Sequence, residues 1–442
     1  MKSINSTPLL TQVRPTYFSA DCGMCYIMRT GGGRFVIIDG NIGEYDEPEH
    51  IFSLISEQNE NGGKPVIAAW FITHPHSDHF GGFTEFFKKY KNDVVLEKVL
   101  YHFPTPGVFD NEGSDKTEFL SVLSGLDTEI VTPRTNDVFT FDDARFDVLF
   151  TCEDLYPGPV SNINNSSLVM IMELGNYRVL WLGDLQREGA EYICANVDKA
   201  RLKCDILQVG HHGYGGGNDE LHRAADPEIL LWPCPDFWFH SVRLWESNDY
   251  LIHSGKIRAT FVAGQQENVF DLTQPIEYTE PYQKSAICPD LSKKSLVALD
   301  WSCLTGGRTG YAPAALKFTD GGCVLSAGDA LTLCQMIQRG QTAKGEKYSF
   351  EFSGKVEKAE LFGIIFDVTD PMQPCTESIV ELDTEGEFAY RLEVNKKDLT
   401  AALYSNGKKL RNWKNICSEP CEIILTMKNA EIKLKRVFFE YM

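Results

Sequence analysis

Positive charge is scarce in this chain. Its 442 residues carry 42 Lys and Arg against 62 Asp and Glu, which gives a formal net charge of -20. A field of that sign repels nucleic-acid backbones, so the composition argues against a dedicated DNA or RNA binder and against long polyanionic substrates. A small phosphoester held by metal ions is still compatible with this charge.

Long apolar runs are absent as well. The N-terminal residues contain no apolar core of the length that a signal peptide requires, and no later stretch reaches membrane-spanning length. We therefore expect a soluble, cytoplasmic protein with no membrane partner.

The chain also lacks a complete zinc-ribbon motif, which needs two cysteine pairs at matching spacing. The thirteen cysteines are odd in number and spread over a large chain, which favours reduced thiols over a disulfide framework. Cys22 and Cys25, and likewise Cys417 and Cys421, are spaced like half of a zinc ribbon, but no matching second pair follows. We interpret all four as packing or turn residues.

Histidine is the most informative of the scarce residues. Only ten occur, yet three fall in the phrase T-H-P-H-S-D-H-F-G-G, which places His74, His76, Asp78 and His79 directly after the apolar run 66–72. Buried polar side chains need partners, and metal ions can satisfy all four together. We predict a dinuclear site, with His74 and His76 on one ion and Asp78 and His79 on a second. Solvated loop histidines are the competing interpretation.

The first two-thirds of the chain alternates predicted strands and helices, and a strong hairpin signal joins residues 166–174 to 177–183 through Gly175-Asn176. This order predicts an α/β domain over 1–275 in which helices cover two stacked sheets, an αββα arrangement. The other predicted strands are 17–29, 34–39, 66–72, 94–103, 139–141, 146–150 and 206–209, and the predicted helices are 47–59, 83–90 and 188–195.

The composition changes after about residue 264. Short apolar runs alternate with Gly, Lys, Asp and Thr, which predicts a separate β-rich domain over 285–442, in the form of a sandwich with one helix over 328–338. Aromatic residues of this tail could stack on sugar rings or could pack in its core, and they are Trp301, Tyr311, Tyr390, Tyr404 and Trp413. The domain could equally serve a structural or oligomerising role.

A dinuclear site needs more ligands than the histidine loop supplies. Asp184 ends the run L-W-L-G-D, and His211 and His212 end the run I-L-Q-V-G, so both runs bring polar side chains to a sheet edge. Asp184 could bridge both ions, and one of the two late histidines should complete the second ion. Asp39, after V-I-I, could orient a ligand histidine or simply cap a turn.

Together these motifs resemble the metallo-β-lactamase superfamily of hydrolases. The phrases D-C-G-M-C at Asp21, N-N-S-S-L-V at Asn164 and Q-V-G-H-H-G at Gln208 are similar to the branch that contains the hydrolase domain of the competence DNA-uptake channel protein and, more distantly, the phosphorylcholine esterases. The resemblance covers roughly residues 12–265 and leaves the tail outside it.

The resemblance implies which residues hold each ion. His74 and His76 would bind the first ion, and Asp78, His79 and His212 the second, with Asp184 between them. His211 would then be free to donate to substrate, although the reverse assignment of His211 and His212 stays open.

The third ligand of the first ion departs from the superfamily pattern. Asn164 stands where much of the superfamily has a third histidine. An amide oxygen is a weaker zinc ligand than imidazole, so zinc could be replaced there by manganese or iron. His102 is an alternative ligand, and a plain strand-end histidine is its competing interpretation.

The predicted function is metal-dependent hydrolysis by a hydroxide held between two divalent ions. A phosphodiester or phosphomonoester is the first expected substrate, a lactone or thioester the second and a β-lactam the third. A different hypothesis is a weakly catalytic scaffold whose C-terminal module binds a glycan or protein partner. Aromatic residues near the late loop could wall a pocket or anchor the domain interface, and they are Trp232, Phe237, Trp238, Phe239 and His240.

Overall fold

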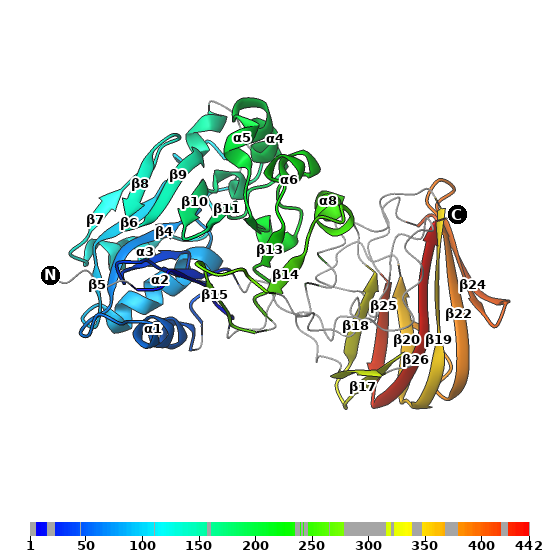
Figure 1. Cartoon of the computed structure of the whole chain (residues 1–442). Helices are drawn as coiled ribbons and strands as arrows, with labels where there is room; N and C mark the ends of the chain where they lie inside the picture. Colours follow the sequence, from blue (N-terminus) through cyan, green and yellow to red (C-terminus); the bar gives the residue numbers. More distant parts are fainter. Residues whose placement is uncertain are drawn as a thin grey trace. The chain divides into compact units, whose positions relative to one another are not determined.

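The chain divides into two compact units, one over residues 1–239 and 247–278 and the other over 240–246 and 279–442 (Figure 1). The computed structural model describes residues 6–15, 23–44, 46–109, 111–156, 161–234, 239, 242, 246–264, 266–277, 315–319, 322–337, 347–366, 379–416 and 423–441. The predicted positions Trp301, Tyr311, Phe237, Trp238, His240, Cys22, Cys417 and Cys421 lie outside these residues.

The first unit contains two mixed sheets. One has the order β15-β1-β2-β3-β4-β6-β7, with β5 also paired to β4, and the other has the order β14-β13-β12-β11-β10-β9-β8. The strands of the first sheet are β1 Leu9–Gln12, β2 Tyr26–Arg29, β3 Phe35–Ile38, β4 Val66–Ile72, β5 Val95–Leu96, β6 Lys98–Tyr101, β7 Glu129–Val131 and β15 Asn268–Asp271. Those of the second are β8 Val138–Phe141, β9 Ala144–Phe150, β10 Val169–Leu174, β11 Tyr177–Trp181, β12 Ile206–Gln208, β13 Ile229–Trp232 and β14 Ala259–Val262.

Strand β4 shows why the two sheets stack. Ala69 and Phe71 join a core shared with Met170 and Trp181 of the second sheet, whereas Trp70 packs on the opposite face against the helices. Because β4 is buried on both faces, its sequence is a continuous apolar run rather than an alternating one. Full burial of a side chain such as Phe71 stabilises the fold by roughly 1.5–3 kcal/mol.

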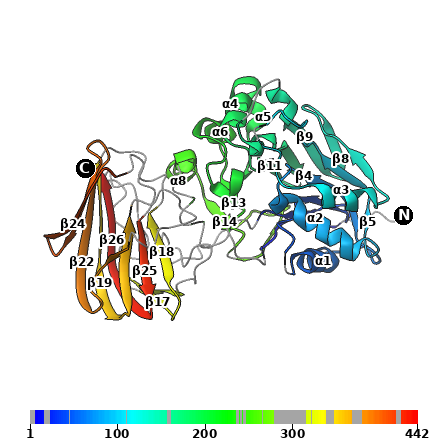
Figure 2. The ribbon, with the colours of Figure 1, turned by 180° about the vertical axis from the view of Figure 1, so that it is seen from behind.

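Helices cover the outer faces of both sheets (Figures 1 and 2). Ile51 of α1, Phe83 and Phe86 of α2 and Phe119 of α3 form one cluster with Trp70 of β4. The helices are α1 Glu47–Glu57, α2 Ser77–Tyr90, α3 Thr117–Ser124, α4 Arg187–Asn196, α5 Lys199–Leu202, α6 Asp219–Ala225 and α8 Asp249–His253. The predicted αββα class is therefore confirmed. No helix within the described ranges has the length and apolar character needed to cross a bilayer.

The start of α2 corrects one prediction. The sequence predicted a helix from Phe83 because Gly81-Gly82 favours a turn, but α2 begins at Ser77 and runs through both glycines. A Cβ atom on Gly82 would lie 1.6 Å from the carbonyl oxygen of Gly40. These glycines therefore serve close packing of the helix on the turn after β3, and Asp78 and His79 occupy the first helical turn.

The second unit is a sandwich of antiparallel sheets, as predicted. One sheet has the order β16-β17-β26-β19-β22-β23-β24 and the other β18-β25-β20-β21, and residues of both, such as Phe352 and Phe362, share one core. The strands are β16 Ala315–Thr319, β17 Gly322–Ala327, β18 Thr332–Ile337, β19 Lys347–Lys358, β20 Leu361–Phe366, β21 Val380–Glu381, β22 Gly386–Asn395, β23 Thr400–Ser405, β24 Lys408–Lys414, β25 Ile423–Lys428 and β26 Ala430–Tyr441.

The helix predicted over 328–338 is wrong, because this stretch contains β18. Its residues Leu, Cys, Gln and Met are tolerated in helices, but β18 pairs with β25 along Thr332–Ile337. Pairing with a neighbouring strand outweighs such weak local preferences. Of the tail aromatics within the described ranges, Tyr390 is buried in the core, Trp413 packs against it, and Tyr404 is half-exposed.

The buried His222 of α6 should make the stability of the first unit fall at acidic pH. Its ring is buried against Gly217, and burial lowers the pKa of His222 to about 4. Between that value and the ordinary 6.5, the unfolded chain binds a proton that the folded chain excludes, so stability falls as pH drops through this window. We expect a loss of roughly 3 kcal/mol at pH 4 relative to pH 7, from 1.36 kcal/mol per pKa unit.

The measurement is urea unfolding of the wild type and His222→Gln between pH 7 and pH 4. Glutamine is uncharged throughout, so the variant should lose less stability on acidification than the wild type by this amount. Parallel pH dependences in the two proteins would contradict the assignment.

Candidate metal centre

The histidine loop is anchored by the turn after β3. Asp39 accepts hydrogen bonds from the Thr73 backbone N–H at 2.8 Å and from the Thr73 hydroxyl at 2.7 Å, and its Oδ2 lies 2.7 Å from Nδ1 of His79. The Trp70 indole donates to the Asp39 carbonyl oxygen at 3.0 Å. The contact predicted between Asp39 and a loop histidine is thus present, and it directs Nε2 of His79 away from Asp39 and toward the second sheet.

The second sheet contributes Asp184 and His212. Asp184 follows β11, and its backbone N–H donates to the Ser167 hydroxyl at 2.9 Å. His212 follows β12, and its Nδ1 lies 2.6 Å from the Pro233 carbonyl oxygen, which leaves Nε2 facing the cluster. Because the carbonyl oxygen can only accept, Nδ1 of His212 carries the proton, and the lone pair of Nε2 can bind a metal.

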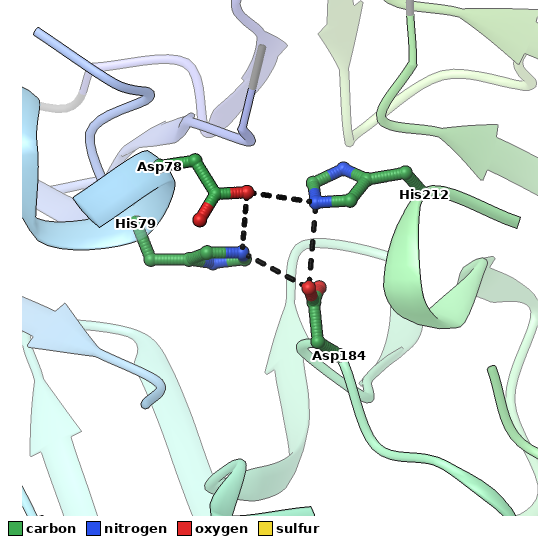
Figure 3. A group of neighbouring side chains, drawn as sticks. All are labelled: Asp78, His79, Asp184 and His212. Atoms are coloured by element: carbon green, nitrogen blue, oxygen red, sulfur yellow. Dashed lines mark ion pairs between the residues drawn. The ribbon is translucent and has the colours of Figure 1, made fainter. Parts of the chain in front are cut away.

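Four side chains converge on one point, namely those of Asp78, His79, Asp184 and His212 (Figure 3). Oδ2 of Asp184 lies 3.2 Å from Nε2 of His79 and 3.4 Å from Nε2 of His212. Oδ2 of Asp78 lies 3.6 Å and 3.3 Å from the same two nitrogens. One ligand atom from each side chain lies within 4.8 Å of every other.

This spacing fits a metal ion. Two donors bound tetrahedrally at 2.0–2.1 Å are separated by roughly 3.3 Å, close to the distances above. The cluster also contains buried polar atoms without a hydrogen-bond partner: Nε2 of His79, Nε2 of His212 and Oδ1 of Asp184. Buried polar groups are normally satisfied, so a cation that accepts their lone pairs accounts for all three.

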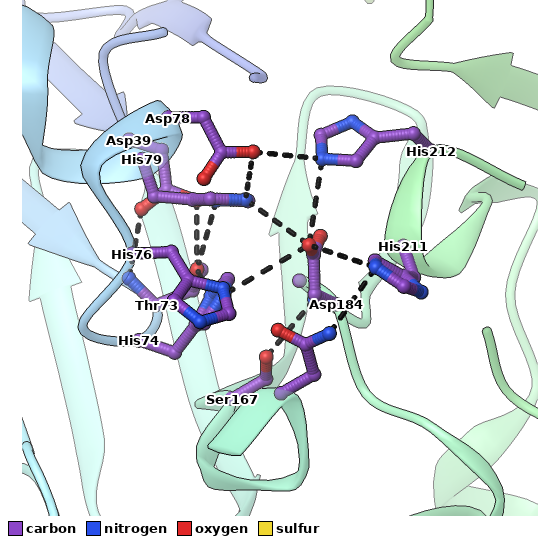
Figure 4. Close-up of polar contacts among 12 residues, drawn as sticks. Asp39, Thr73, His74, His76, Asp78, His79, Ser167, Asp184, His211 and His212 are labelled. Atoms are coloured by element: carbon purple, nitrogen blue, oxygen red, sulfur yellow. Dashed lines mark hydrogen bonds and ion pairs between the residues drawn. The ribbon is translucent and has the colours of Figure 1, made fainter. Parts of the chain in front are cut away.

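Further donors surround the same carboxylate of Asp184 (Figure 4). Nε2 of His74 is 3.1 Å from Nδ1 of His76 and 3.8 Å from Oδ2 of Asp184. Nε2 of His211 is 3.9 Å from the same carboxylate oxygen and 3.1 Å from Nδ2 of Asn164. Oδ2 of Asp184 therefore faces a ring nitrogen of each of four histidines, His74, His79, His211 and His212.

Charges in the cluster are strongly coupled. Burial lowers the pKa of His79, but the carboxylates of Asp184, Asp78 and Asp39 outweigh it and hold that pKa well above its ordinary value. Burial also lowers the pKa of His212, but the carboxylates of Asp184 and Asp78 outweigh it and raise that pKa to about 10. Burial would raise the pKa of Asp184, but the nearby imidazoles keep it well below its usual range. Protons on the rings therefore balance the carboxylates, and a bound cation would displace them.

The turn after β12 holds an unusual backbone. His211 and His212 have φ values of 49° and 53°, in the left-handed region that non-glycine residues rarely adopt. Gly213 follows with φ 82°, and its carbonyl accepts a hydrogen bond from Nδ2 of Asn248 at 2.7 Å. Such conformations persist where the surroundings enforce them, and here they direct two consecutive rings into one site.

The structure brings together every side chain proposed from the sequence: His74, His76, Asp78, His79, Asn164, Asp184, His211 and His212. His102, the alternative ligand, is engaged elsewhere, with Nδ1 2.7 Å from the Pro133 carbonyl oxygen and Nε2 3.5 Å from Glu153. Trp232 and Phe239 are buried with their rings in an edge contact, so these two are packing residues.

Several supporting residues were missed from the sequence. Thr73, Ser167 and the Pro233 carbonyl all orient cluster residues, and Nε2 of Gln186 lies 3.0 Å from Nδ1 of His211. Their only sequence signal is position, because each lies within about five residues of one end of a strand of the first unit.

An αββα fold and a histidine–aspartate cluster at the strand ends of both sheets together characterise the first unit as a domain with a candidate metal centre. Residues 23–226 match the metallo-beta-lactamase superfamily and form a domain of that superfamily.

One relative is ComE operon protein 3 of Bacillus subtilis (strain 168), which is 32% identical over 198 residues. The match covers 42% of this chain and only 24% of that protein, so the chain spans about a quarter of its relative's length. This similarity agrees with the branch predicted from the motifs.

Two solved structures cover 60% of this chain at low similarity. The metallo-beta-lactamase fold protein YhfI of Bacillus subtilis is covered over 99% of its length, at 14% identity and a TM-score of 0.37. CmlA, a diiron β-hydroxylase from Streptomyces venezuelae, is covered over 54% of its length, at 13% identity and a TM-score of 0.37.

Proposed function

We propose that the protein is a hydrolase that uses two divalent cations to cleave a phosphoester. The observation that supports this is the set of buried ring nitrogens and carboxylate oxygens that lack hydrogen-bond partners and face one another across the two sheets. Neutral imidazole and carboxylate donors suit zinc best, and manganese or iron is also compatible with them.

The geometry supports two adjoining ion sites. Asp78, His79 and His212 would hold one ion, His74 and His76 would hold the other, and Asp184 would contact both because its Oδ2 faces rings of each set. His212 is favoured over His211 for the first ion, since Nε2 of His212 contacts both carboxylates at 3.3 and 3.4 Å. Oδ1 of Asn164 is buried and has no hydrogen-bond partner, so it would be the added donor for the His74–His76 ion.

When bound, the cations would supply positive charge for the phosphoryl oxygens and make water a nucleophile near neutral pH. The protein would supply orientation and proton transfer. Asp78 emerges from the first turn of α2 beside His79, where its carboxylate can orient the attacking water. Amide nitrogens of Gln186 and Asn164 lie 3.0 Å from Nδ1 and 3.1 Å from Nε2 of His211, so this ring would accept a proton and pass it to the leaving-group oxygen.

A phosphoester is favoured over a lactone or thioester by the donors beside the ions. Its transition state carries charge on several non-bridging oxygens, whereas an acyl transition state develops one oxyanion. Nδ2 of Asn164 lies 3.1 Å from Nε2 of His211 beside Asp184, and its second N–H offers a donor in addition to the cations. Lactone or thioester hydrolysis is the alternative for the same site.

The test combines elemental analysis of the purified chain with turnover of bis(p-nitrophenyl) phosphate, p-nitrophenyl phosphorylcholine and a lactone. We expect zinc, manganese or iron in the protein and measurable cleavage of a phosphoester. Asp78→Ala should lower that rate by at least about a hundredfold, because it removes both a ligand and the orienting carboxylate.

Asp127→Ala is the matched control, since Asp127 is an exposed aspartate of the same unit. It should leave both metal content and rate unchanged. Protein that binds no metal, or that hydrolyses nothing when zinc and manganese are supplied, would refute the proposal. Cleavage of the lactone alone would transfer the assignment to the alternative substrate class.

A further inference from the structure

The second unit has a hollow with charged side chains in its walls on the outer face of its seven-stranded sheet. Its volume is about 430 Å³, and its lining residues belong to strands β19, β22, β23 and β26 and to the turn after β23. Figure 1 labels β19, β22 and β26 in the second unit. This volume is within the range of roughly 300–1,000 Å³ that small-molecule sites occupy. It lies in a different unit from the metal centre.

Residue size explains why the sheet is hollowed there. Glu351 of β19 pairs with Arg391 of β22, which pairs in turn with Tyr404 of β23, and all three project from the face opposite the core. In the adjoining row, small Ser353 pairs with Ala389. Ser353 and Ala389 therefore form the bottom of the hollow, and the longer side chains of Glu351, Arg391 and Tyr404 form its sides.

The walls carry balanced charge. Arg391 contacts Glu351 at 3.3 Å and Glu393 at 3.0 Å, and Arg436 contacts Glu351 at 3.6 Å. Two guanidinium groups and two carboxylates thus alternate around the hollow, and each is partly exposed, between 30% and 57%. The side chains are held by one another before any ligand arrives, which lowers the entropy lost on binding.

A hairpin turn and an aromatic ring complete the rim. Asn406 and Gly407 join β23 to β24 and line the hollow. The Asn406 backbone N–H donates to the Ala389 carbonyl oxygen at 2.8 Å, so the pairing of β22 with β23 continues into this turn. Tyr404 beside it is half-exposed, and Lys409 Nζ lies 5.5 Å from its ring centroid. Tyrosine combines an apolar ring with a hydroxyl that can donate or accept.

We propose that this hollow binds a neutral saccharide. Each sugar hydroxyl is both a donor and an acceptor, and alternating guanidinium and carboxylate groups can satisfy both roles with charge-assisted hydrogen bonds. An acidic sugar is disfavoured because Glu351 already faces both arginines, and a ligand carboxylate would meet it. The net charge of -20 adds to that repulsion.

The test is isothermal titration calorimetry of the full chain with neutral gluco-, galacto-, manno- and fructo-oligosaccharides, and with oligogalacturonate as the acidic probe. At least one neutral series should bind. Tyr404→Ala and the conservative Glu393→Gln should each weaken binding by about tenfold or more, since each removes ring contact or a charge-assisted hydrogen bond.

Leu410→Ala is the control, because Leu410 lies on β24, is 51% exposed and does not line the hollow. It should bind as the wild type does, and metal content and ester hydrolysis should be unchanged in all three variants. Absence of saccharide binding, tighter binding of oligogalacturonate, or wild-type affinity in both hollow variants with unaltered thermal unfolding would each overturn the proposal.

Discussion

Replacing Asp184 with asparagine is expected to abolish hydrolysis and to leave the protein with less than half of its metal. Oδ2 of Asp184 faces Nε2 of His79 at 3.2 Å, His212 at 3.4 Å and His74 at 3.8 Å, so its one charge would serve both proposed ion sites. The amide keeps the shape but removes that charge. A loss of several kcal/mol of transition-state stabilisation corresponds to a rate at least about a thousandfold lower.

The measurements are metal content after dialysis and phosphoester turnover at saturating metal. Asp205→Asn is the matched control, because Asp205 precedes β12 at the opposite edge of the same sheet and accepts a hydrogen bond from the Arg178 backbone N–H at 2.7 Å. It makes the same chemical change away from the cluster. Full metal content and full activity in Asp184→Asn would show that this carboxylate does not hold the ions.

The second large effect is expected from a single added methyl group at Gly82. An alanine Cβ would lie 1.6 Å from the carbonyl oxygen of Gly40, so either α2 or the turn after β3 must move. We expect a loss of about 3 kcal/mol in the free energy of unfolding. Because Asp78 and His79 are in the first turn of the same helix, activity should also fall, by roughly a hundredfold for a misplacement near 1 Å.

Gly125→Ala provides the comparison, since a Cβ at Gly125 meets its nearest atom at 3.4 Å and the residue has φ −92°. That variant should match the wild type in urea unfolding and in turnover. Wild-type stability of Gly82→Ala would mean that α2 is not packed as closely on Gly40 as the structure has it.

The sequence predicted those parts of the fold in which local chemistry and tertiary context agree. The hairpin of β10 and β11 was predictable because Gly175-Asn176 supplies the turn and both flanking runs are apolar. Short strands such as β1 and β15 were missed, because each has only four residues and β15 pairs with β1 from the opposite end of the first unit. Thr332–Ile337 was misassigned for the same reason, since its strand depends on β25.

The cluster was easier to predict than its supports. His74, His76, Asp78 and His79 are close in sequence, and Asp184 and His212 follow apolar runs that had to be strands. The supports depend on geometry that the sequence does not encode locally. The Pro233 carbonyl meets His212 only because β12 and β13 are parallel neighbours, and Asn164 meets His211 only through a turn before β10.

The division of the cluster between two sheets also has a mechanical consequence. His79 belongs to α2 after the first sheet, and Asp184 and His212 follow strands of the second, so an ion held by all three would act as a removable cross-link between the two halves of the domain. Resistance to unfolding would then depend on the supply of free metal, rising by about 2.7 kcal/mol at a concentration 100 times the dissociation constant. A chelator would remove the catalyst and loosen the domain in a single step.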